Sequence, residues 1–465
     1  MKPGQQEARQ TPEARQDAPS QEGGGKIVYG RNGVPIHVRG GSRTTGGGYR
    51  TYEVHQRMRV GESTAKVKPN AMLTREYLED PYPTLAILRE NYPCYRDWIG
   101  NSYWVSRYDD VTSIFTDDAN FETRPKLWFY GREDFGRDFG QALPVLFAQA
   151  QRTDAHAGPV AEAILAELAG DGQGDLAVAF AARYAMEMLA RVLDLPAADF
   201  DFFVERYWKM QQGYGWSPRA EQAGLEAMTE LTRYFEPLLK QRRADPGDDL
   251  ISAIAGLETE TGPTTAQDLV ATLLERDHET LHGALANMWY LLLTHPEQLE
   301  LLREDDRLVK YAYQETLRHS TPVLEAKRFA RHEVERFGKL LPEGALLICS
   351  SGAANRDPRA FKDPDLFEVN RKDLCRREPR GQYRADGLPT GITFGLGQPT
   401  KHPAVPEDRP RSLYAITRDT VVTASKCVLE MLPGLRLVDG AAPHLRALRV
   451  GDMHTCWQLP ATWRR

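Results

Sequence analysis

The strongest constraint on the fold is a long apolar segment with the periodicity of a helix. Residues 265–295 read TAQDLVATLLERDHETLHGALANMWYLLLTH, with apolar side chains on nearly every face. Thr265 follows Gly262-Pro263-Thr264 and is suited to cap the N-terminus, and Pro296 ends the pattern. A helix that is apolar all round must be enclosed by other elements. We therefore expect one continuous central helix over residues 265–295 within a large domain.

Other segments predict a mainly α protein with a small β subdomain. Residues 176–195 and 225–241 carry apolar side chains at three- and four-residue spacing, which is typical of amphipathic helices. A final helix is expected over residues 420–432, before a Pro-Gly pair. The apolar run at residues 345–351 predicts a buried strand.

The N-terminal part differs in composition from the rest. Residues 1–25 are polar and poor in large apolar side chains, which predicts disorder. Residues 26–78 form an extension in which Asn32-Gly33 predicts a β-hairpin. The first 70 residues hold 12 Lys and Arg against 6 Asp and Glu, so a solvated tail or a docking arm is expected. The main domain is expected to span residues 79–465.

Overall charge and cysteine content exclude several classes of protein. The net charge is −6, so nucleic acid and anionic membranes are not favoured partners. The five cysteines are scattered and form no CxxC pair, which argues against a disulfide framework or a structural zinc site. No run of about 18 apolar residues occurs in the sequence. We expect a cytoplasmic protein that binds a protein partner or a hydrophobic small molecule.

Five segments resemble the cytochrome P-450 superfamily of haem-thiolate monooxygenases, in the style of its bacterial members. They occur in the family's order and include HETLHGALANMWYLLLTHPEQLELLR, similar to the central helix, and YQETLRHSTPV, with the family's Glu-x-x-Arg pair. The segments are residues 80–111, 245–254, 278–303, 313–323 and 353–367. The resemblance covers about residues 79–460 and implies the cytochrome P-450 fold with its long central helix.

The haem-binding loop departs from the family pattern. In the family, Phe-Gly-x-Gly-x-His-x-Cys supplies the thiolate that binds haem iron and favours O–O cleavage. Here the sequence after Phe394 is GLGQPTKHPAVPEDRPR. Counting forward from Phe394 puts Lys401 at the cysteine position, and counting back from the end of the final helix puts Arg411 there. His402 is the one good alternative iron ligand in this loop, although a surface histidine is the plainer interpretation. The resemblance therefore implies either no haem or haem with non-cysteine ligation.

The dioxygen site of the family is also altered. The family's Ala-Gly-x-Glu/Asp-Thr corresponds here to Arg276, Asp277, His278, Glu279 and Thr280. Glu279 and Thr280 match the proton relay, but two long or charged side chains replace the small pair. An unpaired charge against a haem face would be costly. If the vacated pocket is catalytic without haem, then Asp277, His278 or Glu279 would act as general acid or base.

Two further groups of family residues are partly kept. Glu315 and Arg318 match the structural Glu-x-x-Arg pair, and their spacing places them on one helix face. The family's third partner, an arginine, is replaced by Leu366, so that network is expected to be incomplete. His156 and Arg328 match propionate-binding positions and would bind cofactor only if haem is present.

Three functions follow from the resemblance. The first is a haem-free auxiliary protein of a biosynthetic enzyme in secondary metabolism, since some members without the cysteine activate glycosyltransferases that attach deoxysugars. The second is an unorthodox haem oxidoreductase, with His402 or another non-thiolate ligand. The third is a haem-independent enzyme, such as an isomerase or lyase, that acts on a hydrophobic metabolite. Aromatic-rich loops at residues 122–150 and 204–220 suit a hydrophobic guest as well as they suit packing.

Overall fold

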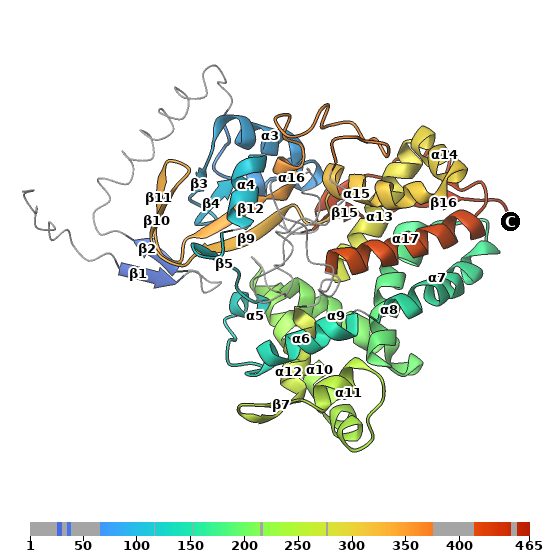
Figure 1. Ribbon diagram of the computed structural model, residues 1–465, viewed down its shortest axis with the longest axis horizontal. Coiled ribbons are helices and arrows are strands. Elements are labelled where there is room, and N and C mark those ends of the chain that lie inside the picture. Colours follow the sequence, from blue (N-terminus) through green and yellow to red (C-terminus); the bar gives the residue numbers. More distant parts are fainter. Residues whose placement is uncertain are drawn as a thin grey trace, which may run out of the picture.

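The chain folds mainly into helices with several small sheets, which confirms the predicted fold class (Figure 1). The computed structural model describes residues 66–115, 117–150, 152–213, 217–275, 278–374, 413–447 and 453–465, and the strands β1 (Lys26–Tyr29) and β2 (Pro35–Val38). β1 and β2 pair antiparallel, with Lys26 opposite Val38. The expected disorder of residues 1–25 lies outside the described residues, and the division into domains stays a prediction.

The helices follow one another along most of the chain. They are α2 (Arg75–Glu79), α3 (Tyr82–Asn91), α4 (Tyr108–Phe115), α5 (Lys126–Phe129), α6 (Phe139–Ala150), α7 (Asp154–Ala169), α8 (Arg183–Leu193), α9 (Phe200–Gly213), α10 (Pro218–Ala244), α11 (Leu250–Ala255), α12 (Ala266–Leu274), α13 (His278–Thr294), α14 (Pro296–Glu304), α15 (Val309–His319), α16 (Ser351–Ala354) and α17 (Leu413–Met431). A π-helical segment, η2 (Leu176–Ala182), leads into α8.

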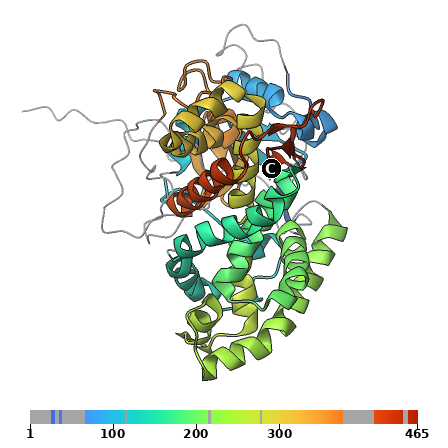
Figure 2. The ribbon, with the colours of Figure 1, turned by 90° about the vertical axis from the view of Figure 1, so that its right-hand side faces the viewer.

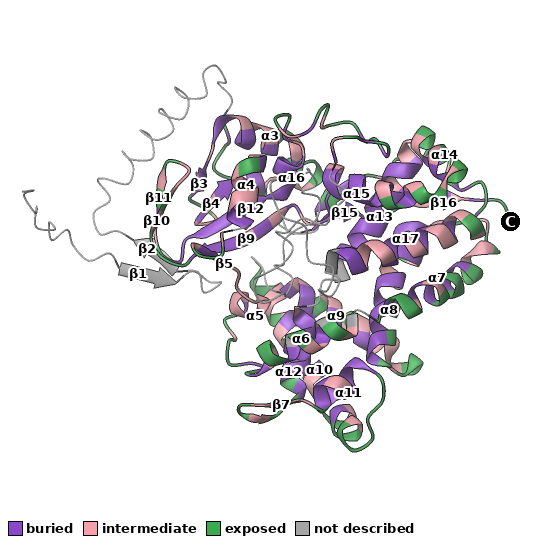
Figure 3. Ribbon diagram, viewed as in Figure 1, coloured by how far each residue is buried: buried purple, intermediate pink, exposed green. Residues whose placement is uncertain are grey.

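The largest sheet joins strands that are far apart in the sequence. Its order is β3 (Tyr95–Asp97), β4 (Ser102–Val105), β12 (Leu346–Ser350), β9 (Glu325–Ala330) and β5 (Phe121–Glu122). β12 runs parallel to β4 and antiparallel to β9. Every residue of β12 is buried, which confirms the strand expected from the apolar run at residues 345–351 (Figure 3).

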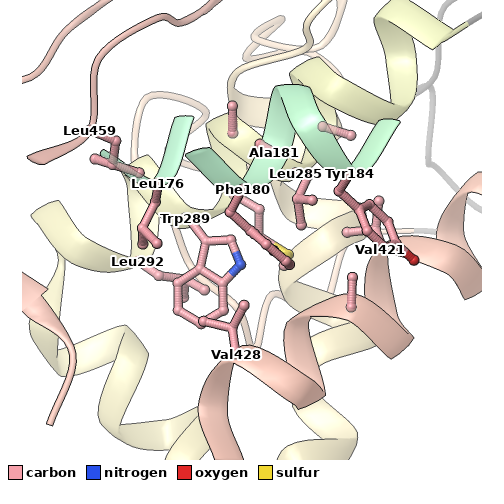
Figure 4. Packing of buried hydrophobic residues seen from close by; sticks show 14 of the residues in the cluster. Leu176, Phe180, Ala181, Tyr184, Leu285, Trp289, Leu292, Val421, Val428 and Leu459 are labelled. Atoms are coloured by element: carbon pink, nitrogen blue, oxygen red, sulfur yellow. The ribbon is translucent and has the colours of Figure 1, made fainter. Parts of the chain in front are cut away.

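The main hydrophobic core surrounds α13. It contains side chains from α7, α8, α13, α15 and α17, and Trp289 of α13 lies among Phe180, Leu292 and Val428 (Figure 4). A second core joins α5, α6, α9, α10, α11 and α12. Figures 1 and 2 show the large sheet and α17 toward one end of the molecule and α9 to α11 toward the other.

The expected single central helix is instead two helices, α12 and α13. Thr265 caps α12 through a capping box with Asp268, as the sequence predicts, but α12 ends at Leu274. The Gln211 side-chain amide donates to the carbonyls of Leu273 and Leu274 at 3.1 and 3.0 Å. In a continuous helix those carbonyls would accept from backbone N–H groups four residues later. A side chain from α9 therefore supplies hydrogen bonds to the last two carbonyls of α12, and no periodicity in residues 265–295 could reveal it.

Other expected boundaries also change. The helix predicted over residues 225–241 is part of α10, which begins after the cap Ser217 and has 27 residues. The final helix begins seven residues earlier than predicted, at Leu413. The aromatic-rich segments 122–150 and 204–220 were expected to be loops, but they contain α5, α6 and much of α9. Aromatic side chains of both segments pack into the second core: examples are Tyr130, Phe135 and Tyr207.

Candidate functional site

The Glu-x-x-Arg pair forms a buried ion pair on α15. Arg318 Nε and Nη2 each donate to one carboxylate oxygen of Glu315 at 2.7 Å, and both side chains are fully buried. The remaining Arg318 donors reach backbone carbonyls, including that of Pro364 at 2.7 Å. This bidentate geometry makes the pair strong and directional.

The expected incompleteness of this network is wrong, because Arg371 supplies the third group. Arg371 Nε donates to Glu315 Oε1 at 3.1 Å, and its other nitrogens donate to the carbonyls of Lys362, Asp363 and Leu366. The family motif has this arginine at the position of Leu366, whereas here the guanidinium group belongs to Arg371, five residues later. Leu366 contributes its backbone carbonyl instead of a side chain.

The region matching the dioxygen site lies at the break between α12 and α13. Arg276 and Asp277 lie outside the described residues, and α13 begins at His278. Thr280 in the first turn of α13 is fully buried, and its hydroxyl has no hydrogen-bond partner within the part of the chain that the structure describes. The roles expected for Asp277, His278, Glu279 and Thr280 stay predictions.

A polar network at the end of α12 was missed by the sequence analysis. Glu275 follows α12 and accepts a hydrogen bond from the backbone N–H of Lys126 at 2.5 Å. Lys126 Nζ donates to Gln211 Oε1 at 2.9 Å. Desolvation raises the pKa of Glu275 to about 6, although Lys126 acts in the opposite direction. Glu275 is visible in the sequence TLLERDHET, but its hydrogen-bond partner Lys126 lies 149 residues away.

Two histidines, one in α13 and one in the strand that contacts it, are buried. His282 is 1% exposed and its ring packs edge-on against Trp208 and Trp457, with centroids 5.8 and 5.3 Å away. His454 in β15 (His454–Cys456) is 2% exposed. Burial lowers the pKa of each histidine to about 4, so both are neutral near pH 7.

These histidines predict a loss of stability in acid. An unfolded histidine titrates near its ordinary pKa of about 6.5, so the unfolded state binds more protons than the folded state between about pH 6.5 and pH 4. The stability contribution of neutral His282 and His454 is complete above that window and is lost as pH falls through it. Unfolding measured near pH 5 should take up about two protons from these groups.

The test compares His282→Gln with His332→Gln as a control at an exposed histidine. The first variant should flatten the pH dependence of the denaturation midpoint between pH 6.5 and pH 4, and the control should leave it unchanged. Equal pH profiles for both variants would contradict the conclusion that buried His282 contributes to the loss of stability in acid.

The two expected propionate-binding residues lie on different elements. Arg328 is buried in β9, where Nη1 donates to the Lys327 carbonyl at 2.8 Å and the guanidinium lies 5.1 Å from the centre of the Phe115 ring. His156 is half-buried in the first turn of α7, which packs along α17. The binding of haem propionates by Arg328 and His156 stays a prediction.

Four cysteines lie among the described residues, in or beside core elements. Cys94, Cys349 and Cys456 are buried, and burial raises the pKa of each thiol to about 12. Cys427 lies in the middle of α17, and burial also raises its pKa. Phe394, Lys401, His402 and Arg411 lie outside the described residues. The segment that holds the family's iron ligand therefore lies outside the described residues, and the loss of cysteine ligation stays a prediction.

The described residues contain neither a cluster of metal ligands nor a helix that could span a membrane. Within these ranges, no three His, Cys, Asp or Glu side chains gather as metal ligands would. Among the same residues, no helix combines the length and apolar character needed to cross a bilayer.

Comparison with known proteins places the chain in a family. No protein-family model matches it. It is 30% identical to pulcherriminic acid synthase of Bacillus subtilis over 334 residues, which cover 66% of this chain and 81% of the relative. It is also 28% identical to the cytochrome P-450 monooxygenase PikC of Streptomyces venezuelae over 423 residues, covering 84% and 93%. The chain belongs to the cytochrome P-450 superfamily.

The fold of this cytochrome P-450 superfamily member is shared with solved structures. The bacillaene polyketide synthase cytochrome P-450 PksS of Bacillus subtilis superimposes with a TM-score of 0.66 at 19% identity, over 86% of this chain and all of PksS. The Glu315, Arg318 and Arg371 network lies within this shared fold.

Proposed function

We propose that this cytochrome P-450 superfamily member does not hold haem through a cysteine thiolate and acts as a haem-free auxiliary protein of a biosynthetic enzyme in secondary metabolism. The observation that carries the proposal is the sequence between Phe394 and α17, which contains no cysteine. Haem-thiolate oxygen activation requires that sulfur ligand. Without that cysteine, no thiolate is available to bind the haem iron and favour O–O cleavage.

Three features support the proposal. The described cysteines Cys94, Cys349 and Cys456 are buried, and none of them lies between Phe394 and α17. The central helix is broken beside Arg276 and Asp277, where the family keeps small residues. PikC is named a monooxygenase and PksS is named with a polyketide synthase, which supports a role in secondary metabolism.

The test is haem loading of the full chain. The protein is expressed with haem precursor, purified, and examined by its absorption spectrum, its iron content and a pyridine haemochrome assay. We expect no Soret band and no stoichiometric haem. One equivalent of haem with the carbonyl difference band of thiolate ligation would overturn the proposal.

Haem without that thiolate signature would favour the alternative of ligation by His402. In that outcome His402→Ala should abolish the Soret band, whereas His332→Ala, at an exposed histidine, should keep it. The auxiliary role itself is tested by assaying a glycosyltransferase that attaches a deoxysugar, with and without the purified protein. We expect its turnover to rise at least several-fold, and unchanged turnover would contradict the role.

A further inference from the structure

The turn that joins β3 to β4 exposes two adjacent apolar side chains. Trp98 is 50% exposed and Ile99 is 46% exposed, whereas Tyr95 and Trp104 in the two strands are buried. Single exposed apolar side chains are common on protein surfaces, but neighbouring ones rimmed by polar groups mark sites of interaction. The turn is therefore a candidate for contact with another molecule.

Arg96 of β3 braces this turn from within. Its Nη1 donates to the carbonyls of Asp97 and Ser102, each at 2.9 Å, and its Nη2 donates to Asn101 Oδ1. Asp97, which is 7% exposed, turns its carboxylate into the turn and accepts from the backbone N–H of Ile99 at 3.0 Å. The backbone of the turn is thus fixed before any partner binds, and this lowers the entropy lost on binding.

Two cations lie beside the apolar pair. The Arg96 guanidinium lies 4.6 Å from the ring centres of both Trp98 and Tyr103. Lys339, the first residue of the neighbouring strand β11 (Lys339–Leu341), places its Nζ 5.7 Å from the same Tyr103 ring (Figure 1). The charges that stack on the aromatic rings of this hairpin are therefore positive, and they stand next to an aromatic anchor.

Three kinds of molecule could cover this surface, and its charges favour one of them. In a symmetric dimer built on the turn, Arg96 and Lys339 of both copies would approach each other, which is unfavourable. A lipid surface would be held by only two cations and two apolar side chains, and the whole chain has a net charge of −6. A protein partner can offer an apolar recess rimmed by carboxylates, which complements both features of the turn.

We propose that the Trp98–Ile99 turn is the docking surface for the partner enzyme, which receives Trp98 in an apolar recess and places carboxylates opposite Arg96 and Lys339. This inference rests on the proposed auxiliary function. Tryptophan and arginine are the side chains that most often dominate the binding energy of an interface. A stable complex covers about 800 Å² on each partner, so the turn is the anchor of a wider contact.

Binding of the full chain to a glycosyltransferase that attaches a deoxysugar tests the docking surface. The dissociation constant is measured by isothermal titration calorimetry, together with the turnover of the glycosyltransferase. Trp98→Ser should raise the dissociation constant at least about 30-fold and remove most of the rise in turnover. Val178→Ser, at a 57% exposed side chain in η2, is the matched control and should change the constant by less than about threefold.

The outcomes separate the docking surface from the proposed function. If the unmodified chain and Trp98→Ser raise turnover equally, the docking surface is wrong and the auxiliary function stands. If the unmodified chain neither binds the glycosyltransferase nor raises its turnover, both are wrong. Self-association in sedimentation, or binding to vesicles of phosphatidylcholine and phosphatidylserine, that Trp98→Ser abolishes would assign the turn to a second copy or to lipid and overturn the proposal.

Two further variants keep the test decisive if Trp98→Ser loses its fold, because Trp98 also stacks on Arg96. Ile99→Ser leaves that stacking in place and should weaken binding at least about threefold. Lys339→Glu reverses a charge at the rim and should lower the association rate, most strongly at low salt. Unchanged affinity of Ile99→Ser together with an unchanged association rate of Lys339→Glu would refute the docking surface.

Discussion

Replacing Glu315 by glutamine should lower the free energy of unfolding by about 3–5 kcal/mol, because it leaves the buried Arg318 without its counter-charge and Arg371 with only the more exposed carboxylates of Asp373 and Glu368. Glu315 accepts from Arg318 twice at 2.7 Å and from Arg371 once at 3.1 Å. Glutamine has nearly the same shape, but its amide group would present hydrogens to a donor. The measurement is the denaturant midpoint and slope of the purified variant.

The chain contains a closely matched control for this experiment. Glu300 and Arg303 on α14 have the same Glu-x-x-Arg spacing, but their side chains are 59% and 32% exposed. Glu300→Gln should therefore change stability by less than about 1 kcal/mol. Equal losses in the two variants would show that burial of the α15 pair does not determine its contribution.

Gly224→Ala should lower the free energy of unfolding by about 1–3 kcal/mol through overpacking. A Cβ at this position would lie 2.2 Å from the Tyr130 hydroxyl and 3.0 Å from the Cα of Gly213. Alanine is the better helix former by up to about 1 kcal/mol, so the steric cost must exceed that gain for the prediction to hold. The measurement is again denaturant unfolding.

Two comparison variants separate steric cost from helix propensity. Gly140→Ala lies in α6 with open space around its Cβ, so it should be neutral or stabilising. Tyr130→Phe removes the clashing hydroxyl, so the double variant Tyr130→Phe with Gly224→Ala should lose less than the sum of the two single changes. Additive losses would indicate that the contact with Gly213 alone decides the outcome.

Local signals in the sequence predicted some elements well. The cap at Thr265, the buried strand at residues 346–350 and the pairing of Glu315 with Arg318 each depend on neighbours within a few positions. The sequence and its resemblance to a family also predicted the fold class. The assignment of haem-related roles to His156, Arg328 and His402 stays a prediction.

What the sequence could not predict depends on partners that are distant along the chain. The helix α12 ends at Leu274, where the side chain of Gln211, more than 60 residues earlier, donates to the last two carbonyls. The third arginine of the buried network was missed because Arg371 reaches the place expected for a residue at position 366. Residue spacing alone carries no information on either contact.

The pairing within the large sheet bears on how the chain folds during synthesis. β4 at Ser102 pairs with β12 at Leu346, so about 240 residues of intervening chain separate two adjacent strands. Closing so long a loop is entropically unfavourable until helices have condensed the intervening segment. On the ribosome, β4 can pair with β3 at once, but more than half of the protein must emerge before β4 meets β12. The other edge of β4 is open to chaperones or to aggregation during that interval.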